Sequence, residues 1–258
     1  MQVKDEQLFQ AASTGNLSTI SSILAEYSPP TETLQETIVK AIHPNANLSV
    51  VTELLLQRFP DLPLSEDMIR WSCYAGSIPI ADAILTKEPQ AYTGSFDDEK
   101  GTPMVLAVQS QQSYDFLSHL LSHGADPFLH HGRQAPLFAA AVIRYRGKLD
   151  AVAAMMDHGV NLQHRNLLAA AVSRGYLELA QYLLAHGITP ENDRSADNQR
   201  QEPVLHIAVS GGDLKMVQLL LEYGERVDVK NGQGLTTVQV AEEMQHLRMI
   251  ELLRGRPS

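Results

Sequence analysis

Residues 144–148 carry the side chains best suited to bind an anion. The segment contains Arg144, Arg146 and Lys148, with Tyr145 between the two arginines. An arginine can bind a carboxylate or phosphate through two parallel hydrogen bonds, and a tyrosine combines an apolar ring with a polar tip. The cluster therefore predicts a site for an acidic partner segment or an anionic ligand. A solvated loop that balances an acidic protein is the competing interpretation.

Residue patterns typical of catalysis or metal binding are absent from the sequence. There is no Gly-rich phosphate loop, no Gly-x-Ser-x-Gly elbow and no His-Glu-x-x-His pair. The single cysteine, Cys73, has no neighbouring base, which favours a buried and inert thiol. His123, His158 and His186 each precede a glycine, where a histidine complements a helix dipole more readily than it binds a metal. We expect no catalytic residue, no cofactor and no metal, and we lean against an enzyme.

The elements that would position these residues repeat along the chain. A small residue recurs within an apolar stretch over 230 residues in seven intervals, an average spacing of about 33. The series consists of Ala11, Ala41, Ser72, Ala107, Ala140, Ala171, Ala208 and Ala241. A small side chain lets two helices approach closely, so each repeat is expected to place its small residue in the interior.

Helices are predicted within each repeat. Apolar side chains recur at helical spacing, for example at Leu177, Ala180, Leu183 and Leu184. Pro103 and Pro136 occupy positions where the first turn of a helix tolerates a missing N–H. Gly124, Gly159, Gly187 and Gly224 follow paired apolar residues and are expected to end helices in the left-handed conformation. No single repeat can bury its own apolar face, so the repeats must stack.

The seventh repeat carries the most informative motif. Leu205-His206-Ile207-Ala208-Val209 leads into the apolar run 216–221, and the repeat closes with Asn231-Gly232-Gln233-Gly234-Leu235-Thr236. Over nearly its whole length the chain resembles the ankyrin repeat family. The resemblance implies an all-α solenoid of stacked helix-turn-helix units with connecting hairpins or loops. It also implies a single domain, 1–258, with approximate units 5–31, 32–63, 64–100, 101–133, 134–164, 165–200, 201–233 and 234–258.

The resemblance further implies a concave groove lined by the first helices and the loops. Residues that follow the recurring small residue and its neighbour in each repeat unit then become candidates for partner or ligand binding. They are Tyr74, Gln109, Ser110, Arg144, Tyr145, Arg146, Arg174 and Met244. We predict a non-catalytic scaffold that recognises a partner protein through this groove. The alternative is a small-molecule-binding protein or an unconventional enzyme of lyase, isomerase or cyclase type that uses the groove as its pocket. A self-associating structural element is a third hypothesis.

The sequence also predicts where three aromatic residues of the third repeat unit lie. Polar segments interrupt the repeats at residues 88–101 and 191–202, and such insertions often lie on the binding face. In the first, Tyr92 and Phe96 are expected to dock onto the groove. Trp71 falls at an apolar core position and is expected to pack between repeat units.

Composition narrows the classes of partner and the compartment. The 258 residues include 30 acids and 20 bases, for a net charge of −10, which argues against a nucleic-acid partner and an anionic membrane partner. Residues 1–100 hold 14 of those acids and 6 of the bases, or −8. The sequence has a single cysteine, no apolar leader and no run of about 20 apolar residues. These features predict an intracellular, cytoplasmic location, with the nucleus left open.

Overall fold

The computed structural model describes residues 3–46, 48–96, 101–129, 145–163, 166–190 and 202–255. Within these ranges the chain forms fifteen α-helices and no strand, which confirms the predicted all-α class. Contacts divide the chain into two compact units, 1–137 and 138–258, and each is described by itself.

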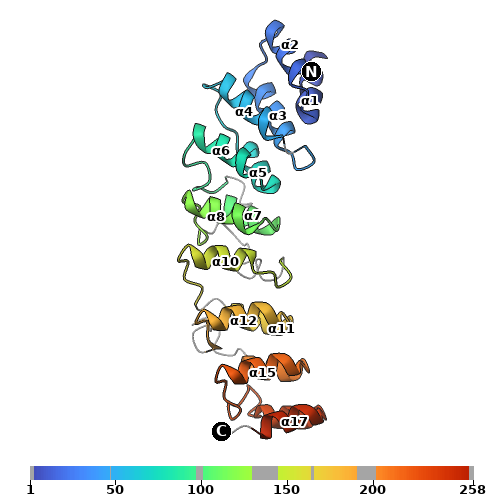
Figure 1. The fold of residues 1–258 in the computed structure, drawn as a ribbon, viewed down its shortest axis with the longest axis vertical. Coiled ribbons are helices and arrows are strands. Elements are labelled where there is room, and N and C mark those ends of the chain that lie inside the picture. Colours follow the sequence, from blue (N-terminus) through green and yellow to red (C-terminus); the bar gives the residue numbers. More distant parts are fainter. Residues whose placement is uncertain are drawn as a thin grey trace. The chain divides into compact units, whose positions relative to one another are not determined.

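The first unit consists of helices that follow one another in pairs (Figure 1). The first helix of each pair packs against the first helix of the next pair: α1 against α3, α3 against α5 and α5 against α7. Among the second helices of the pairs, α4 packs against α6. Their bounds are α1 (Val3–Thr14), α2 (Leu17–Glu26), α3 (Thr31–Ile42), α4 (Ser49–Arg58), α5 (Glu66–Ala75), α6 (Ile78–Lys87), α7 (Pro103–Gln109) and α8 (Tyr114–Ser122).

The second unit continues the pattern of paired helices. First helices again pack in sequence, α11 against α14 and α14 against α16, and α12 packs against α15. The bounds are α10 (Asp150–Asp157), α11 (Leu167–Ser173), α12 (Leu177–Ala185), α14 (Val204–Ser210), α15 (Leu214–Glu222), α16 (Thr237–Glu243) and α17 (Leu247–Arg254). The division of the whole chain into eight ranges stays a prediction, and α1 begins at Val3, ahead of the first predicted range.

The recurring small residues lie in the interior of both units. Each one that the structure describes is at most 4% exposed: Ala11, Ala41, Ser72, Ala107, Ala171, Ala208 and Ala241. Ala140 lies outside the described residues. Because these residues all sit on first helices, their burial confirms the register read from the sequence and explains why the first helices approach one another closely.

Side chains cap many of the helices at their N-termini. The hydroxyl of Thr102 accepts a hydrogen bond of 3.2 Å from the Val105 N–H at the start of α7, and Pro103 occupies the first turn as predicted. Thr236 and Gln239 form a reciprocal capping box at α16. Such side-chain oxygens satisfy N–H groups that have no partner within the helix. Pro136 lies outside the described residues.

Turns between the two helices of a pair are covered by the next pair. At Gly76, where φ is +65°, an added Cβ would lie 1.7 Å from the Gln112 side chain. At Gly147, where φ is +83°, it would lie 2.7 Å from the Tyr176 ring. The positive φ favours glycine at both turns, and at Gly147 the base of the Tyr176 ring also leaves no room for a Cβ. The four glycines expected to follow second helices, at 124, 159, 187 and 224, all have positive φ.

Candidate functional site

The most distinctive surface feature lies where the segment after α3 meets α5. Pro44, Asp67, Arg70, Trp71 and Tyr74 line an open hollow of about 460 Å³, named here the aromatic hollow. The spacing of Asp67, Trp71 and Tyr74 on α5 places all three on one face of that helix. Two successive helix pairs therefore supply the walls of the aromatic hollow.

Aromatic rings form a continuous cluster at this hollow. The Trp71 ring centroid lies 4.5 Å from that of His43, which follows α3, and 5.4 Å from that of Tyr74. Trp71 does pack between successive helix pairs, as predicted, but it is half-buried rather than part of the core. Tyr74, a predicted binding residue, is 39% exposed. The cluster thus presents aromatic surface to solvent.

Arg70 is fixed at the edge of the hollow. It is 8% exposed, and its guanidinium lies 2.9 Å from the Glu66 carboxylate and 4.0 Å from that of Asp67. The same guanidinium sits 4.1 Å from the centre of the Phe96 ring, a cation–π contact. Several partners therefore hold this side chain, so its position is set before any ligand arrives.

The aromatic residues of the 88–101 segment lie inside the first unit. Tyr92 is 1% exposed and its hydroxyl lies 2.7 Å from the Ser72 hydroxyl, while Phe96 is 4% exposed. Burial raises the pKa of Tyr92 and keeps its hydroxyl protonated. Both residues thus dock onto α5 as structural anchors, whereas the sequence placed them on the groove.

Cys73 is buried beside Ser72, as the sequence predicts. Burial raises the pKa of its thiol to about 12, so the reactive thiolate is suppressed at neutral pH. Among the described residues there is also no group of three or more His, Cys, Asp or Glu side chains that could hold a metal.

The predicted residues of the fourth helix pair contribute little exposed surface. Gln109 and Ser110 are half-buried, and the Ser110 hydroxyl donates a 2.7 Å hydrogen bond to the Leu106 carbonyl. The nearby Gln112 donates a 2.8 Å hydrogen bond to the Tyr74 carbonyl, which joins this pair to the aromatic hollow. Gln112 is not among the residues predicted from the sequence, although its place in the turn facing the preceding pair could have indicated it.

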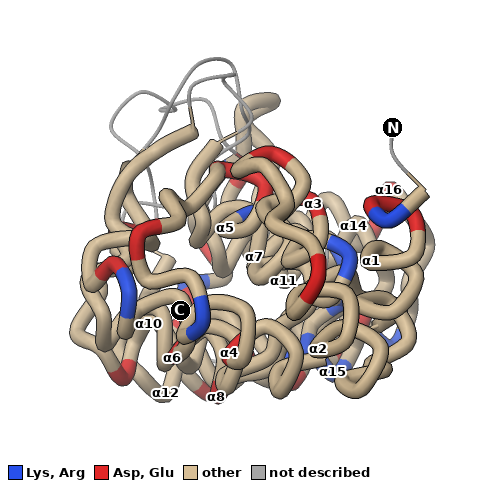
Figure 2. Tube along the Cα trace, turned by 90° about the horizontal axis from the view of Figure 1, so that it is seen from above, with Lys and Arg blue, Asp and Glu red and all other residues tan. Residues whose placement is uncertain are grey.

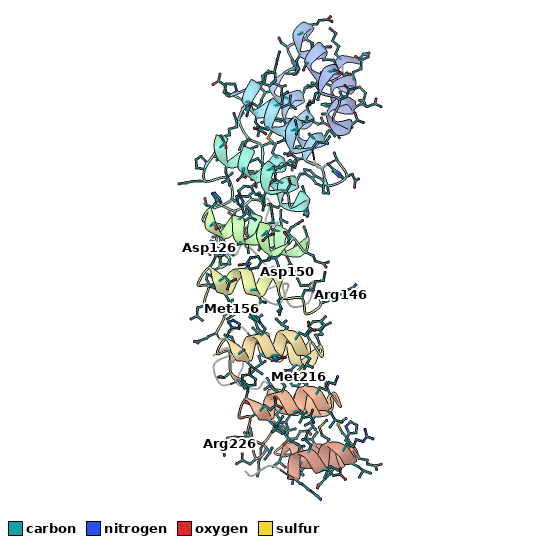
Figure 3. All side chains as sticks on the ribbon, viewed as in Figure 1. Asp126, Arg146, Asp150, Met156, Met216 and Arg226 are labelled. Carbon is teal, nitrogen blue, oxygen red and sulfur yellow. The ribbon has the colours of Figure 1, made fainter. Side chains whose placement is uncertain are left out.

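The predicted residues of the second unit fall into two groups. Arg146, Arg174 and Met244 are exposed, and Arg146 points away from the helices in Figure 3. Tyr145 is 3% exposed, and burial together with the charge of Asp150 raises its pKa. Tyr145 is therefore a buried residue, whereas the sequence predicts an exposed anchor at this position. Arg144 lies outside the described residues.

Histidines that follow second helices bond to those helices. Nδ1 of His123 donates to the His119 carbonyl at 2.8 Å, and Nδ1 of His186 donates to the Tyr182 carbonyl at 2.7 Å. The two bonds satisfy carbonyls near a helix C-terminus, in keeping with the expected helix-end role. His206 is fully buried, and its Nε2 lies 3.0 Å from the Leu235 carbonyl of the next repeat.

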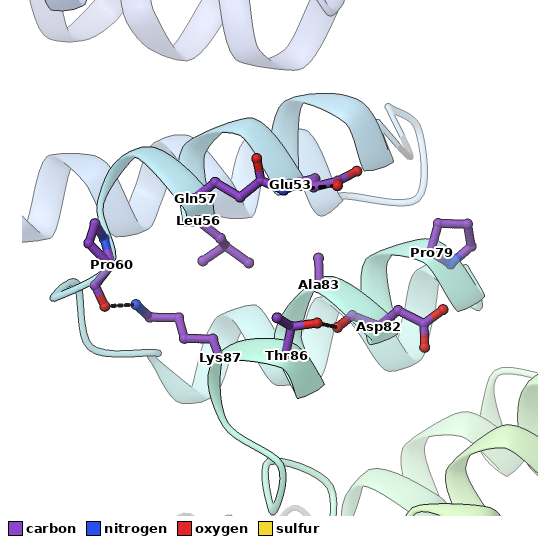
Figure 4. Close-up of a pocket in the computed structure, with 9 residues that line it drawn as sticks. All are labelled: Glu53, Leu56, Gln57, Pro60, Pro79, Asp82, Ala83, Thr86 and Lys87. Carbon is purple, nitrogen blue, oxygen red and sulfur yellow. Dashed lines mark hydrogen bonds between the residues drawn. The ribbon is translucent and has the colours of Figure 1, made fainter.

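A second open hollow lies between α4 and α6 (Figure 4). Its volume is about 550 Å³, and Leu56 and Ala83 contribute apolar surface to it. Lys87 donates hydrogen bonds to the carbonyls of Phe59 and Pro60 across its end. The polar groups of this hollow thus bond largely to the protein itself.

Parts of the chain are similar in sequence to a protein-family model and to known proteins. A protein-family model described as "Ankyrin repeats (many copies)" matches residues 167–221 and 205–254 of the sequence. The chain is 30% identical over 128 residues to "Cyclin-dependent kinase 4 inhibitor B" of Bos taurus, a match that covers 48% of this chain and 93% of that protein. It is 28% identical over 116 residues to "Alpha-latrotoxin-Lg1a" of Latrodectus geometricus, covering 43% of this chain.

Other similarities concern shorter segments or the fold. The match to human "Ankyrin repeat and KH domain-containing protein 1" is 31% identical over 97 residues and covers 36% of this chain. The chain spans 8% of the length of the latrotoxin and 4% of the length of the KH-domain protein. The crystal structure of the human ASB11 ankyrin repeat domain superposes with a TM-score of 0.59 at 19% identity, covering 97% of this chain and 99% of that one.

No helix in the described ranges has the length and apolar character needed to cross a membrane.

Proposed function

The chain belongs to the ankyrin repeat family, and we propose that it is a non-catalytic module that binds a partner protein through the ends of its first helices. The observation that carries this proposal is the aromatic hollow, where Tyr74 and the half-buried Trp71 present ring surface between two helix pairs. Aromatic and arginine side chains supply much of the binding energy at protein interfaces. The name of the bovine relative, a kinase inhibitor, is in keeping with a protein partner.

A stacked array suits this role for a physical reason. The described first helices bury their recurring small residue, and side chains cap the N-termini of α5, α7 and α16, so the backbone of these helices is ordered before binding. A surface that is ordered in advance loses less conformational entropy when a partner docks, so modest contacts can give useful affinity.

The second unit supplies a separate part of the proposed surface. Arg146 and Arg174 are exposed there and are suited to an acidic partner segment. Met244, which is 40% exposed, adds an adaptable apolar contact. Replacing Arg144, Arg146 and Arg174 together with alanine should weaken partner binding and leave the melting temperature near that of the parent. An unchanged affinity for the partner would show that these three arginines do not contribute to binding.

Site-specific photo-crosslinking tests the proposal as a whole. A photoreactive phenylalanine analogue is introduced at Tyr74, Ser110 or Met244, and at Val50 of α4 as a control that is 61% exposed. The protein is then irradiated in extract from its native cells, and adducts are identified by mass spectrometry. We expect one partner to be recovered from the three first-helix positions. Recovery from Val50 alone, or no protein adduct at any first-helix position, would contradict the proposal.

A further inference from the structure

We propose that the aromatic hollow binds the cationic side chain of a lysine or arginine in a basic segment of the partner protein. This inference rests on the proposed function and adds the chemistry of the ligand. The side chain's stem would pack on Trp71 and Tyr74, and its charge would lie near the Asp67 carboxylate.

Ring geometry is the first argument for a cation. Trp71 and Tyr74 are tilted by 55° to each other at a centroid distance of 5.4 Å, so they present two ring surfaces to a ligand in the hollow. The negative face of an aromatic ring attracts a cation, and tryptophan does so most strongly. Lysine and arginine also carry methylene stems that pack on apolar surface while the charge stays in water.

Local charge is the second argument. The Asp67 side chain is 73% exposed at the rim of the hollow, whereas Arg70 is buried against Glu66 at 2.9 Å. Two carboxylates and one guanidinium leave this group with one net negative charge. An acidic ligand would therefore be repelled at the rim. An apolar ligand would cover Asp67 without giving it a partner, which is unfavourable.

Charge over the surrounding helices has the same sign. Helices α1, α3 and α5 together carry six acidic and three basic side chains, and α7 carries neither. Figure 2 marks the acidic residues in red and the basic residues in blue along the described chain. The first 100 residues hold 14 acids and 6 bases. A field of this sign attracts a basic segment over several ångströms and weakens with added salt. The hollow would then select one cationic side chain from that segment.

The hollow is also held in place by the residues around it. Arg70 is fixed by Glu66 and by the Phe96 ring, and the backbone at Tyr74 is held by the Gln112 side chain. A site formed in advance requires little reorganisation to accept a ligand.

The fluorescence of Trp71 provides a direct test, because it is the only tryptophan in the sequence. The whole chain is titrated with blocked Gly-Ser peptides that carry one central lysine, arginine, norleucine or glutamate. We expect a saturable change with the lysine and arginine peptides, in the millimolar range typical of a single side-chain contact, and none with the norleucine or glutamate peptide. Equal responses to lysine and norleucine would overturn the proposal, as would no saturable response to lysine and arginine.

Matched variants separate the hollow from general electrostatics. Asp67→Asn should weaken lysine-peptide binding about fivefold, roughly 1 kcal/mol. Asp61→Asn, which removes the same charge at an exposed position outside the hollow, should leave the affinity within about twofold. Tyr74→Ala should weaken binding to a similar degree as Asp67→Asn. Equal effects of the two aspartate variants would overturn the assignment.

The crosslinking result separates a failure of the cation site from a failure of the proposed function. A partner captured at Tyr74 whose binding is indifferent to Asp67→Asn would refute the cation site and leave the proposed function standing. Absence of any adduct at the first-helix positions would refute the proposed function itself.

Discussion

Gln112 covers Gly76 and reaches past it to the preceding residues. Its Nε2 donates a 2.8 Å hydrogen bond to the Tyr74 carbonyl, and a Cβ added at Gly76 would lie 1.7 Å from its Oε1. The turn at Gly76 has φ of +65°, which side chains other than glycine adopt at a cost. One side chain of the fourth helix pair therefore fixes the turn of the third pair and the edge of the aromatic hollow.

Gly76→Ala should destabilise the first unit by about 1.5–3.5 kcal/mol. About 1–2 kcal/mol comes from a left-handed alanine, and about 0.5–1.5 kcal/mol comes from displacing the Gln112 hydrogen bond. In a Gln112→Ala background the second contribution is already lost, so Gly76→Ala should then cost less. Urea denaturation followed by Trp71 fluorescence gives the four free energies of unfolding. Strict additivity of the two changes would contradict the contact.

Ala208→Leu should destabilise the second unit by roughly 1–3 kcal/mol, because Ala208 is 2% exposed where first helices pack and the larger side chain overpacks them. Ala185→Leu is the matched control at an exposed position of α12 and should change stability by less than about 0.5 kcal/mol. Urea denaturation monitored by far-UV circular dichroism measures both. A neutral Ala208→Leu would mean that the packing register of α14 is wrong.

Thr102→Ala should cost about 1 kcal/mol, because it removes the hydroxyl that caps the Val105 N–H at the start of α7. Thr102→Ser keeps a hydroxyl at the same position and should retain most of that stability. The comparison uses Trp71 fluorescence during urea denaturation. If serine and alanine destabilise equally, the methyl group of Thr102 rather than its hydroxyl matters.

The repeating scaffold could be predicted from sequence because its determinants are local and recur. A small residue every 33 positions or so, a capping threonine before Pro103 and a glycine after α8, α10, α12 and α15 specify helix pairs without knowledge of distant contacts. The spacing also predicts which faces are buried, and the burial of Ala41, Ala171 and Ala241 bears this out.

The candidate site was less predictable because exposure depends on neighbouring repeats. Tyr145 and Tyr74 each lie two residues before a turn glycine, Gly147 and Gly76, yet Tyr145 is 3% exposed and Tyr74 is 39% exposed. Trp71 is an apolar residue at an apolar position, and its contact with His43 of the preceding pair follows from stacking and not from helical spacing. The position of a residue in its repeat predicts on which face of the helix it lies. How much of its side chain stays exposed depends on the neighbouring repeats.

The pH dependence of stability in the first unit should depend on His119. Its side chain is 17% exposed, and Nε2 lies 3.0 Å from the Asp82 carboxylate. Burial lowers the pKa of His119 below its usual value of 6.5, and Asp82 offsets only part of this effect. Protons therefore bind the unfolded chain more readily than the folded one below about pH 6.5.

The free energy of unfolding should accordingly fall as the pH decreases from 7.5 to 5.5. The contribution of one histidine to this slope is at most about 1.4 kcal/mol per pH unit. His119→Gln removes the titrating group while it keeps a hydrogen-bond donor near Asp82, so its loss of stability over the same range should be smaller. Urea denaturation at pH 7.5, 6.5 and 5.5, followed by Trp71 fluorescence, measures the difference. An equal or greater loss in His119→Gln would show that His119 does not govern the acid sensitivity of this unit.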